Sequence, residues 1–339
     1  MMKRYVVGIL AAVLVCASAC SVGPAPTEEP EETKETKQTE TETPPTEETA
    51  ESTEEQDLRS EDVIVLFTAN IGGKADANIG LSGVAALKDA CNETAKHVYL
   101  ADLGDAGSAE AAEQYGGSFV ALSMDVIPYD YAVLGDRDLS LGLSGMTGFA
   151  ETGKIKLLAA NIQYAGEDPL ISELFETMDI VSAGEKKIAF IGVMMPNPAD
   201  ISLISEETGN AFDFMGADAD FLYQILNLYV DDCRMRGADY VVALTHLSEA
   251  QGDPFNVYEF IGRTAGIDAV LNGSGETFKK DSVKNSDGKN VLLAGGGKEF
   301  EGVGKLTISE SGEISADFVT DFSEKDAEIQ SMIDALKAR

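Results

Sequence analysis

Apolar runs alternate with amphipathic segments from about residue 61 to the end of the chain. Every position of the run 63–67 is apolar, which is typical of a strand buried on both faces of a mostly parallel sheet. Strands that alternate with helices predict an α/β fold. We expect helices at 81–92 and 118–127, and further strands at 97–103, 129–134, 155–162, 187–193, 240–245, 269–271 and 291–293.

Two later segments have the periodicity of amphipathic helices. Residues 218–236 predict one such helix, with Gly237 as its C-terminal cap. A last helix is expected to start at Ser323, with Asp326 as a capping partner, and to pack on the domain. Before it, residues 304–309 and 313–319 predict a hairpin. The expected buried side of the first helix comprises Phe221, Leu222, Ile225, Leu228, Tyr229 and Cys233.

The first 20 residues have the pattern of an export signal. Two basic residues precede the apolar stretch 5–19, which is too short for a comfortable transmembrane helix. The residues Ala17-Ser-Ala-Cys20 resemble a bacterial lipobox, with Ala17 where leucine is usual. This resemblance implies cleavage before Cys20 and its lipidation. An ordinary secretory signal is the alternative.

Residues 21–60 are mostly Glu, Thr and Pro, and they predict a disordered acidic linker. The linker would lift a folded domain off a membrane. We therefore expect an exported protein that is lipid-anchored to the outer face of the bacterial cell membrane, or to a membrane facing the periplasm.

Charge and histidine content narrow the chemistry. The formal net charge of -34 repels phosphate backbones, so a nucleic-acid polymer is not an expected partner. Only two histidines occur, which excludes a mechanism that needs three or four imidazoles. His97 starts a strand and is expected to be structural. Cys91 and Cys233 form either a disulfide or two separate buried thiols.

Polar residues follow the ends of several expected strands, where α/β folds carry their chemistry. The order of these loops and the segments around them resemble the metallophosphoesterase domain of bacterial 5′-nucleotidases and cyclic-nucleotide phosphodiesterases, within the calcineurin-like superfamily. The resemblance covers about residues 62–318, and 237–247 is its most specific part. It implies a four-layer α/β sandwich of two mixed β-sheets flanked by helices, here over residues 61–320, with a C-terminal helix at 321–339.

In that family two divalent metals bridge a hydroxide that attacks phosphorus. The resemblance assigns Asp105 to the bridging aspartate and His246 to a metal histidine. Asp136 and Glu276 carry oxygen ligands at positions where the family has other ligands. Asn70 stands where the family has a metal carboxylate.

Three other places differ from the family pattern more strongly. Gly72 replaces a metal imidazole, and the final loop, 273–276, has lost both of its imidazoles. Arg137 occupies the position of the catalytic histidine, and an arginine cannot act as an acid near neutral pH.

These substitutions predict a non-catalytic pseudo-enzyme that binds a ligand or a cation through the former active-site cleft. A divergent divalent-metal-dependent phosphohydrolase, acting on a small phosphoester, is the alternative, so we leave enzyme status open. An intermediate hypothesis has one mainly oxygen-ligated cation. Across these alternatives, the expected cofactor is a divalent metal (Mn, Mg, Ca or Zn) or none. The five candidate ligands of a single cation are Asn70, Asp105, Asp136, His246 and Glu276.

Overall fold

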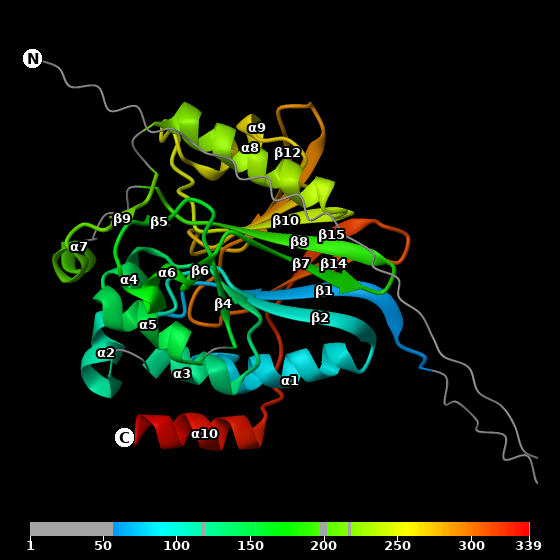
Figure 1. Ribbon diagram of the computed structural model, residues 1–339. Helices are drawn as coiled ribbons and strands as arrows, with labels where there is room; N and C mark the ends of the chain where they lie inside the picture. The colour runs from blue at the N-terminus through cyan, green and yellow to red at the C-terminus, as the bar shows by residue number, and fades with distance from the viewer. Residues whose placement is uncertain (1–56, 117–118, 153, 197–201, 216–217, 339) are drawn as a thin grey trace, which may run out of the picture. The chain divides into compact units, whose positions relative to one another are not determined.

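The computed structural model describes residues 57–338 apart from 117–118, 153, 197–201 and 216–217 (Figure 1). The expected signal segment, Cys20 and nearly all of the expected linker lie outside the described residues. Within the described ranges, no helix is both long and apolar enough to cross a membrane.

Seven strands form the first sheet in the order β15-β14-β1-β2-β3-β4-β6. β1 pairs in parallel with β2 and antiparallel with β14, so the sheet is mixed. The strands are β1 (Ser60–Thr68), β2 (Ala95–Asp102), β3 (Tyr131–Ala132), β4 (Lys156–Leu158), β6 (Phe175–Glu176), β14 (Val303–Ile308) and β15 (Ile314–Val319).

A second mixed sheet of six strands has the order β12-β13-β11-β10-β8-β7. Its parallel centre is formed by β8, β10, β11 and β13, and antiparallel strands close both edges. A short pair, β5 (Gln163–Tyr164) and β9 (Phe212–Asp213), stands apart. The six strands are β7 (Met178–Ala183), β8 (Lys186–Val193), β10 (Tyr240–Thr245), β11 (Ala269–Asn272), β12 (Lys279–Lys284) and β13 (Asn290–Gly295).

Helices cover the outer face of each sheet, which completes four layers (Figure 1). α1 and α3 pack against the first sheet, α10 packs on the outer side of α1 and α3, and α8 and α9 pack against the second sheet. The helices are α1 (Gly80–Asn92), α2 (Ala109–Tyr115), α3 (Phe119–Val126), α4 (Asp136–Leu139), α5 (Gly142–Thr152), α6 (Pro169–Ser172), α7 (Ser202–Thr208), α8 (Ala219–Met235), α9 (Val257–Arg263) and α10 (Ala327–Lys337). The expected four-layer fold is confirmed.

β1 illustrates why apolar runs build this architecture. Side chains alternate across a strand. Val63, Val65 and Phe67 therefore belong to the core between the two sheets. Ile64 and Leu66 belong to the core beneath the helices of the first sheet. A strand with two buried faces requires apolar residues at every position, as the run 63–67 supplies.

The expected buried side of the α8 helix is wrong in part. Phe221 and Leu228 are exposed, whereas Leu222 and Cys233 are buried as expected. Tyr223, Leu226 and Val230, which the prediction left out, complete the buried side. The helix therefore contacts the second sheet through a face rotated from the expected one.

The C-terminal region differs from expectation in one detail. Asp326 is itself the N-terminal cap of α10, because its carboxylate accepts the backbone N–H groups of Glu328 and Ile329. The helix does pack on the domain, with Ile333 fully buried, and β14 and β15 form the expected hairpin.

The cysteine alternatives are resolved in favour of separate thiols. Cys91 lies on α1 and Cys233 on α8, in two different cores, and both are free and buried. His97 has a structural role, with Nε2 3.1 Å from a carboxylate oxygen of Glu61.

Candidate functional site

The loops at the carboxyl ends of strands from both sheets meet at one end of the sandwich. The backbone N–H of Asn70, after β1, donates to the carbonyl of Gly104, after β2, at 2.9 Å. The imidazole of His246, after β10, contacts the carbonyl of Leu103 at 2.7 Å. The side chain of Asn70 reaches the loop after β11. The topology therefore brings the sequence-predicted loops together.

Asn70 is held as a cross-link between these loops. Its side chain is buried, and its amide nitrogen lies 2.7, 3.2 and 2.9 Å from the carbonyl oxygens of Gly273, Gly275 and Gly297. Three acceptors around one atom identify it as the NH₂ donor. Its backbone has a φ of 52°, a conformation in which asparagine is several-fold enriched. The amide thus directs hydrogens, not a ligand oxygen, at this point.

Asp105 occupies the centre of the site. Its Oδ1 accepts the backbone N–H of Arg137 at 2.9 Å. Its Oδ2 lies 3.7 Å from Nε2 of His246 and 3.7 Å from Nε of Arg137. A Cβ atom at Gly135 would lie 2.2 Å from Oδ1, so only glycine at 135 lets the carboxylate take this position.

His246 presents one ring nitrogen to Asp105. The ring is buried, and Nδ1 donates to the carbonyl of Leu103 at 2.7 Å, which leaves Nε2 facing the carboxylate. A carbonyl partner of this kind orients metal-binding histidines in proteins. The close approach requires Gly104, because a Cβ there would lie 2.6 Å from Nδ1.

Arg137 lies beside Gly72, the position at which the resemblance places a metal imidazole. A Cβ atom built on Gly72 would lie 3.8 Å from Nη1 of Arg137. The arginine side chain is about half exposed, at 51%, whereas that of Asp105 is 11% exposed. A guanidinium therefore supplies positive charge next to the carboxylate.

Glu276 and Asp136 have different surroundings. Glu276 is exposed and pairs with Lys298 at 3.1 Å on the surface, so it does not join Asp105 and His246. Asp136 begins α4 and is half-buried beside Arg137 in the chain. Among the described residues, no three His, Cys, Asp or Glu side chains are arranged to hold a metal ion.

Asp138 is a site residue that the sequence prediction missed. Its buried carboxylate accepts the backbone N–H groups of Asp105, Gly107 and Gly135 at 2.7, 2.7 and 2.9 Å. Burial, then repulsion from Asp105, raises the pKa of Asp138 to about 6. The sequence could have indicated this role, because Asp138 lies three residues after Gly135, at the position where an acidic side chain often caps the start of a helix. The carboxylate fastens the second and third loops to each other.

A second buried carboxyl lies beneath the site, at the end of β2. Asp102 accepts the hydroxyl of Thr68 at 2.6 Å and the backbone N–H of Gly104 at 3.0 Å. Burial raises its pKa well above the ordinary value. The hydroxyl of Tyr129 lies 3.0 Å from that of Thr68 and extends the network. This network supports the loops from below.

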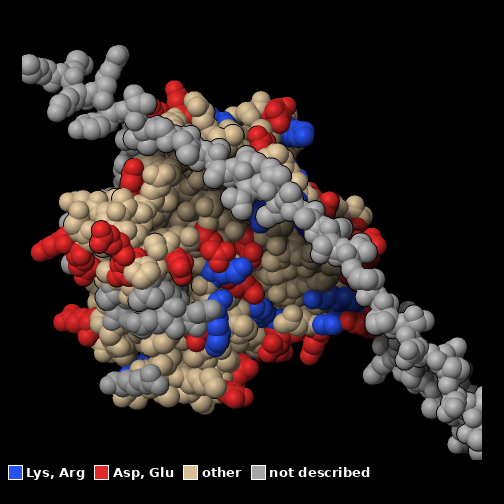
Figure 2. All heavy atoms as spheres, viewed as in Figure 1, with Lys and Arg blue, Asp and Glu red and all other residues tan. Residues whose placement is uncertain are grey.

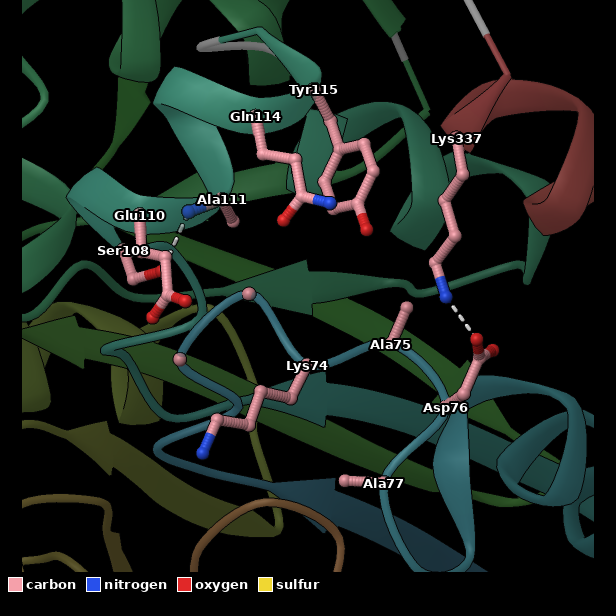
Figure 3. Close-up of a pocket in the computed structure, with 12 residues that line it drawn as sticks. Lys74, Ala75, Asp76, Ala77, Ser108, Glu110, Ala111, Gln114, Tyr115 and Lys337 are labelled. Carbon is pink, nitrogen blue, oxygen red and sulfur yellow. Dashed lines mark hydrogen bonds and ion pairs between the residues drawn. The ribbon is translucent and has the colours of Figure 1, made fainter.

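A hollow of about 230 Å³ lies on the outer side of the first loop (Figure 3). Gly72 and Gly73 form part of its wall, and Gln114 and Tyr115 on α2 point toward its centre. Lys337, on α10, pairs with an aspartate at its rim. The first loop therefore has the site on one side and a small polar hollow on the other.

Acidic side chains are distributed widely over the face of the molecule shown in Figure 2, with fewer basic ones among them. At the strand-end loops, basic residues stand next to acidic ones. Lys74 pairs with Glu299 at 2.6 Å, and Lys298 pairs with Glu276. The mouth of the site is therefore mixed in charge rather than strongly acidic.

No protein-family model and no curated protein sequence match this chain. Its structure is similar to the 5′-nucleotidase precursor from Thermus thermophilus, with a TM-score of 0.70 and 19% identity, covering 82% of this chain and 58% of that one. It is also similar to the NAD nucleotidase of Haemophilus influenzae, with a TM-score of 0.61 and 18% identity, covering 83% and 56%.

A third similar structure is the calcineurin-like phosphoesterase YfkN from Bacillus subtilis, with a TM-score of 0.62 and 16% identity, covering 82% of this chain and 97% of that one. The chain thus spans less than two thirds of the two nucleotidases. The likeness establishes the fold alone, that of the calcineurin-like metallophosphoesterases, since one fold hosts many functions.

Proposed function

We propose that this protein is a non-catalytic member of the metallophosphoesterase fold, which uses the strand-end cleft to bind rather than to hydrolyse. The observation that carries the proposal is the Asn70 amide, which donates toward three backbone carbonyls. The amide nitrogen is committed as a donor and offers no lone pair to a metal, so at most the neutral amide oxygen remains where the resemblance puts a charged carboxylate.

The neighbouring positions support the same conclusion. Gly72 has no side chain to offer a metal, and Glu276 is turned to Lys298. The guanidinium of Arg137 adds a fixed positive charge 3.7 Å from Asp105, which opposes binding of a second cation there. A dinuclear metal centre therefore does not fit these residues, and we derive no hydrolytic step through one.

A second candidate function is retention of a single cation. Nε2 of His246 and Oδ2 of Asp105 are 3.7 Å apart, which is too far for a hydrogen bond. Metal–nitrogen and metal–oxygen bonds of about 2.0–2.2 Å each would span such a gap. These two side chains are the part of the site whose chemistry still suits a metal.

The test is bound metal and hydrolysis, measured on the full chain and on a matched His246→Ala variant. Each is equilibrated with Mn²⁺, Zn²⁺ or Ca²⁺, dialysed and analysed for metal per chain. Each is then assayed with p-nitrophenyl phosphate and bis(p-nitrophenyl) phosphate. We expect no hydrolysis above that of the variant. Two tightly held metals, with hydrolysis that His246→Ala abolishes, would overturn the proposal. One metal that His246→Ala removes would establish the single-cation function.

We also propose that the chain is exported and held at a membrane by a lipid on Cys20. The lipobox-like residues 17–20 and the acidic segment behind them support this placement. Radiolabelled fatty acid should enter the chain in cells and should not enter a Cys20→Ser variant. Equal labelling of both would exclude Cys20 as the anchor.

A further inference from the structure

The helix α8 exposes three large apolar side chains to solvent. Phe221 is 53% exposed, Leu228 is 61% exposed and Met235 is 79% exposed. Only two other large apolar residues of the described part of the chain are comparably exposed, and neither lies on this helix. Their concentration on one element marks a surface, since singly scattered apolar residues are ordinary.

The spacing puts the three side chains on one face. They are separated by seven residues, about two turns of α-helix, so they follow one another along the axis. The buried residues Leu226 and Val230 lie on the other side of the helix, against the second sheet. α8 therefore has two apolar faces, and only one of them is packed against described residues.

We infer that this outer face of α8 binds the same face of a second copy of the chain, with the two helices antiparallel. Phe221 and Met235 are equally distant from Leu228, about 10 Å along the axis in opposite directions. A two-fold axis through Leu228 therefore brings Leu228 against its counterpart and Phe221 against the partner's Met235. Such self-complementarity is what a two-fold interface requires.

The charges at the helix ends favour this orientation. The N-terminal cap, Asp218, and Asp220 in the first turn are acidic, whereas the other end carries Asp231 and Asp232 together with Arg234 and Arg236. Antiparallel helices place Asp220 of one copy level with Arg236 of the other, and parallel helices would place each of these side chains beside its own counterpart. Both side chains remain exposed, by 78% and 56%, while within the chain Asp220 pairs with Arg263 and Arg236 pairs with Asp232.

The size of the surface indicates weak association. One face of a 17-residue helix is smaller than the roughly 1,600 Å² in total that a standard specific interface buries. A surface of this size suits copies that are held close together, as a membrane anchor would hold them. The net charge of -34 opposes association, so screening by salt should strengthen it.

The test uses the full chain with Cys16→Ser and Cys20→Ser, which prevents acylation and leaves only the two buried native thiols. Sedimentation velocity is recorded up to about 1 mM chain, at the weak end of specific affinity. We expect a monomer–dimer equilibrium that tightens with added NaCl. Leu228→Asp should weaken it at least tenfold, whereas Leu58→Asp, at an exposed leucine elsewhere, should not. A monomer throughout, or equal loss in both variants, would overturn the inference.

Disulfide trapping in the same background tests the orientation. Oxidation should cross-link Leu228→Cys, and should cross-link the double variant Phe221→Cys/Met235→Cys, because Cβ atoms must approach within about 4.5 Å. Phe221→Cys alone should stay monomeric. Cross-linking of Phe221→Cys alone would indicate parallel helices and refute the antiparallel pair. If neither Leu228→Cys nor Phe221→Cys/Met235→Cys forms a cross-link, and Phe221→Cys alone also forms none, the interface is refuted.

Discussion

Replacing Asn70 by aspartate should destabilise the fold, because the substitution changes a donor into an acceptor at a point surrounded by acceptors. The amide has two hydrogens, so at least two of the carbonyls of Gly273, Gly275 and Gly297 depend on it. Each buried acceptor left without a partner costs about 1–3 kcal/mol. The Asn70→Asp variant adds a carboxylate facing those oxygens. We therefore expect a loss of about 3–5 kcal/mol, at the upper end for single substitutions.

The matched control is Asn70→Ala, which removes the donor without adding charge and should cost about 2–3 kcal/mol. Urea unfolding of the two variants and the wild-type chain gives the three free energies. The difference between the unfolding free energies of Asn70→Asp and Asn70→Ala gives the contribution of the added negative charge. Mn²⁺ should restore part of the stability of Asn70→Asp and none of that of Asn70→Ala, because only the carboxylate can bind it. Wild-type stability of Asn70→Asp in the absence of metal would refute the reasoning.

Three further predictions concern charged groups. Burial raises the pKa of Asp102, so the folded state keeps a proton that the unfolded chain loses, and stability should fall as pH rises above about 4. Asp102→Asn should flatten that fall in urea titrations, and an unchanged slope would contradict the assignment. Arg137→Ala should tighten Mn²⁺ binding about three- to tenfold by calorimetry, since it removes a half-exposed cation 3.7 Å from Asp105; weaker binding would argue against this role. The Arg234 side chain donates one hydrogen bond to Asp268, at 2.6 Å, and four to backbone carbonyls. Arg234→Met should therefore lower the free energy of unfolding by about 3 kcal/mol. A loss below about 1 kcal/mol would show that this network contributes little to stability.

Much of the fold could be predicted from the sequence, because strands buried on two faces leave an unambiguous pattern. The run 63–67 and the segment 240–245 are strands in the structure. β3 is shorter than expected, with two residues where 129–134 was predicted, because sequence periodicity does not fix where strand pairing ends.

α8 shows where periodicity fails. Its sequence contains two apolar stripes with helical spacing, one through Phe221 and Leu228 and one through Leu222, Leu226 and Val230. Both stripes satisfy the same rule, so a hydrophobic pattern alone cannot choose between them. The second sheet makes the choice, through contacts between residues distant in sequence.

The sequence predicted where the candidate site lies, but it did not predict the directions and partners of the side chains within it. Sequence order placed Asn70, Asp105 and His246 at strand ends, and the structure brings their loops together. It could not reveal that the Asn70 amide points at carbonyls, that Glu276 turns to a lysine, or that Asp138 fastens two loops. These features depend on side-chain geometry that no spacing encodes.

The Asn70 cross-link also restricts how the site can change through mutation. One base change converts an asparagine codon into an aspartate codon, so the genetic code puts no obstacle in front of a carboxylate at this position. The obstacle is the order of events. The loops that supply Gly273 and Gly297 would have to move before an aspartate becomes tolerable. While residue 70 is asparagine, its hydrogen bonds stabilise the present positions of those loops. A path toward a metal-binding carboxylate at residue 70 therefore starts with substitutions elsewhere in those loops.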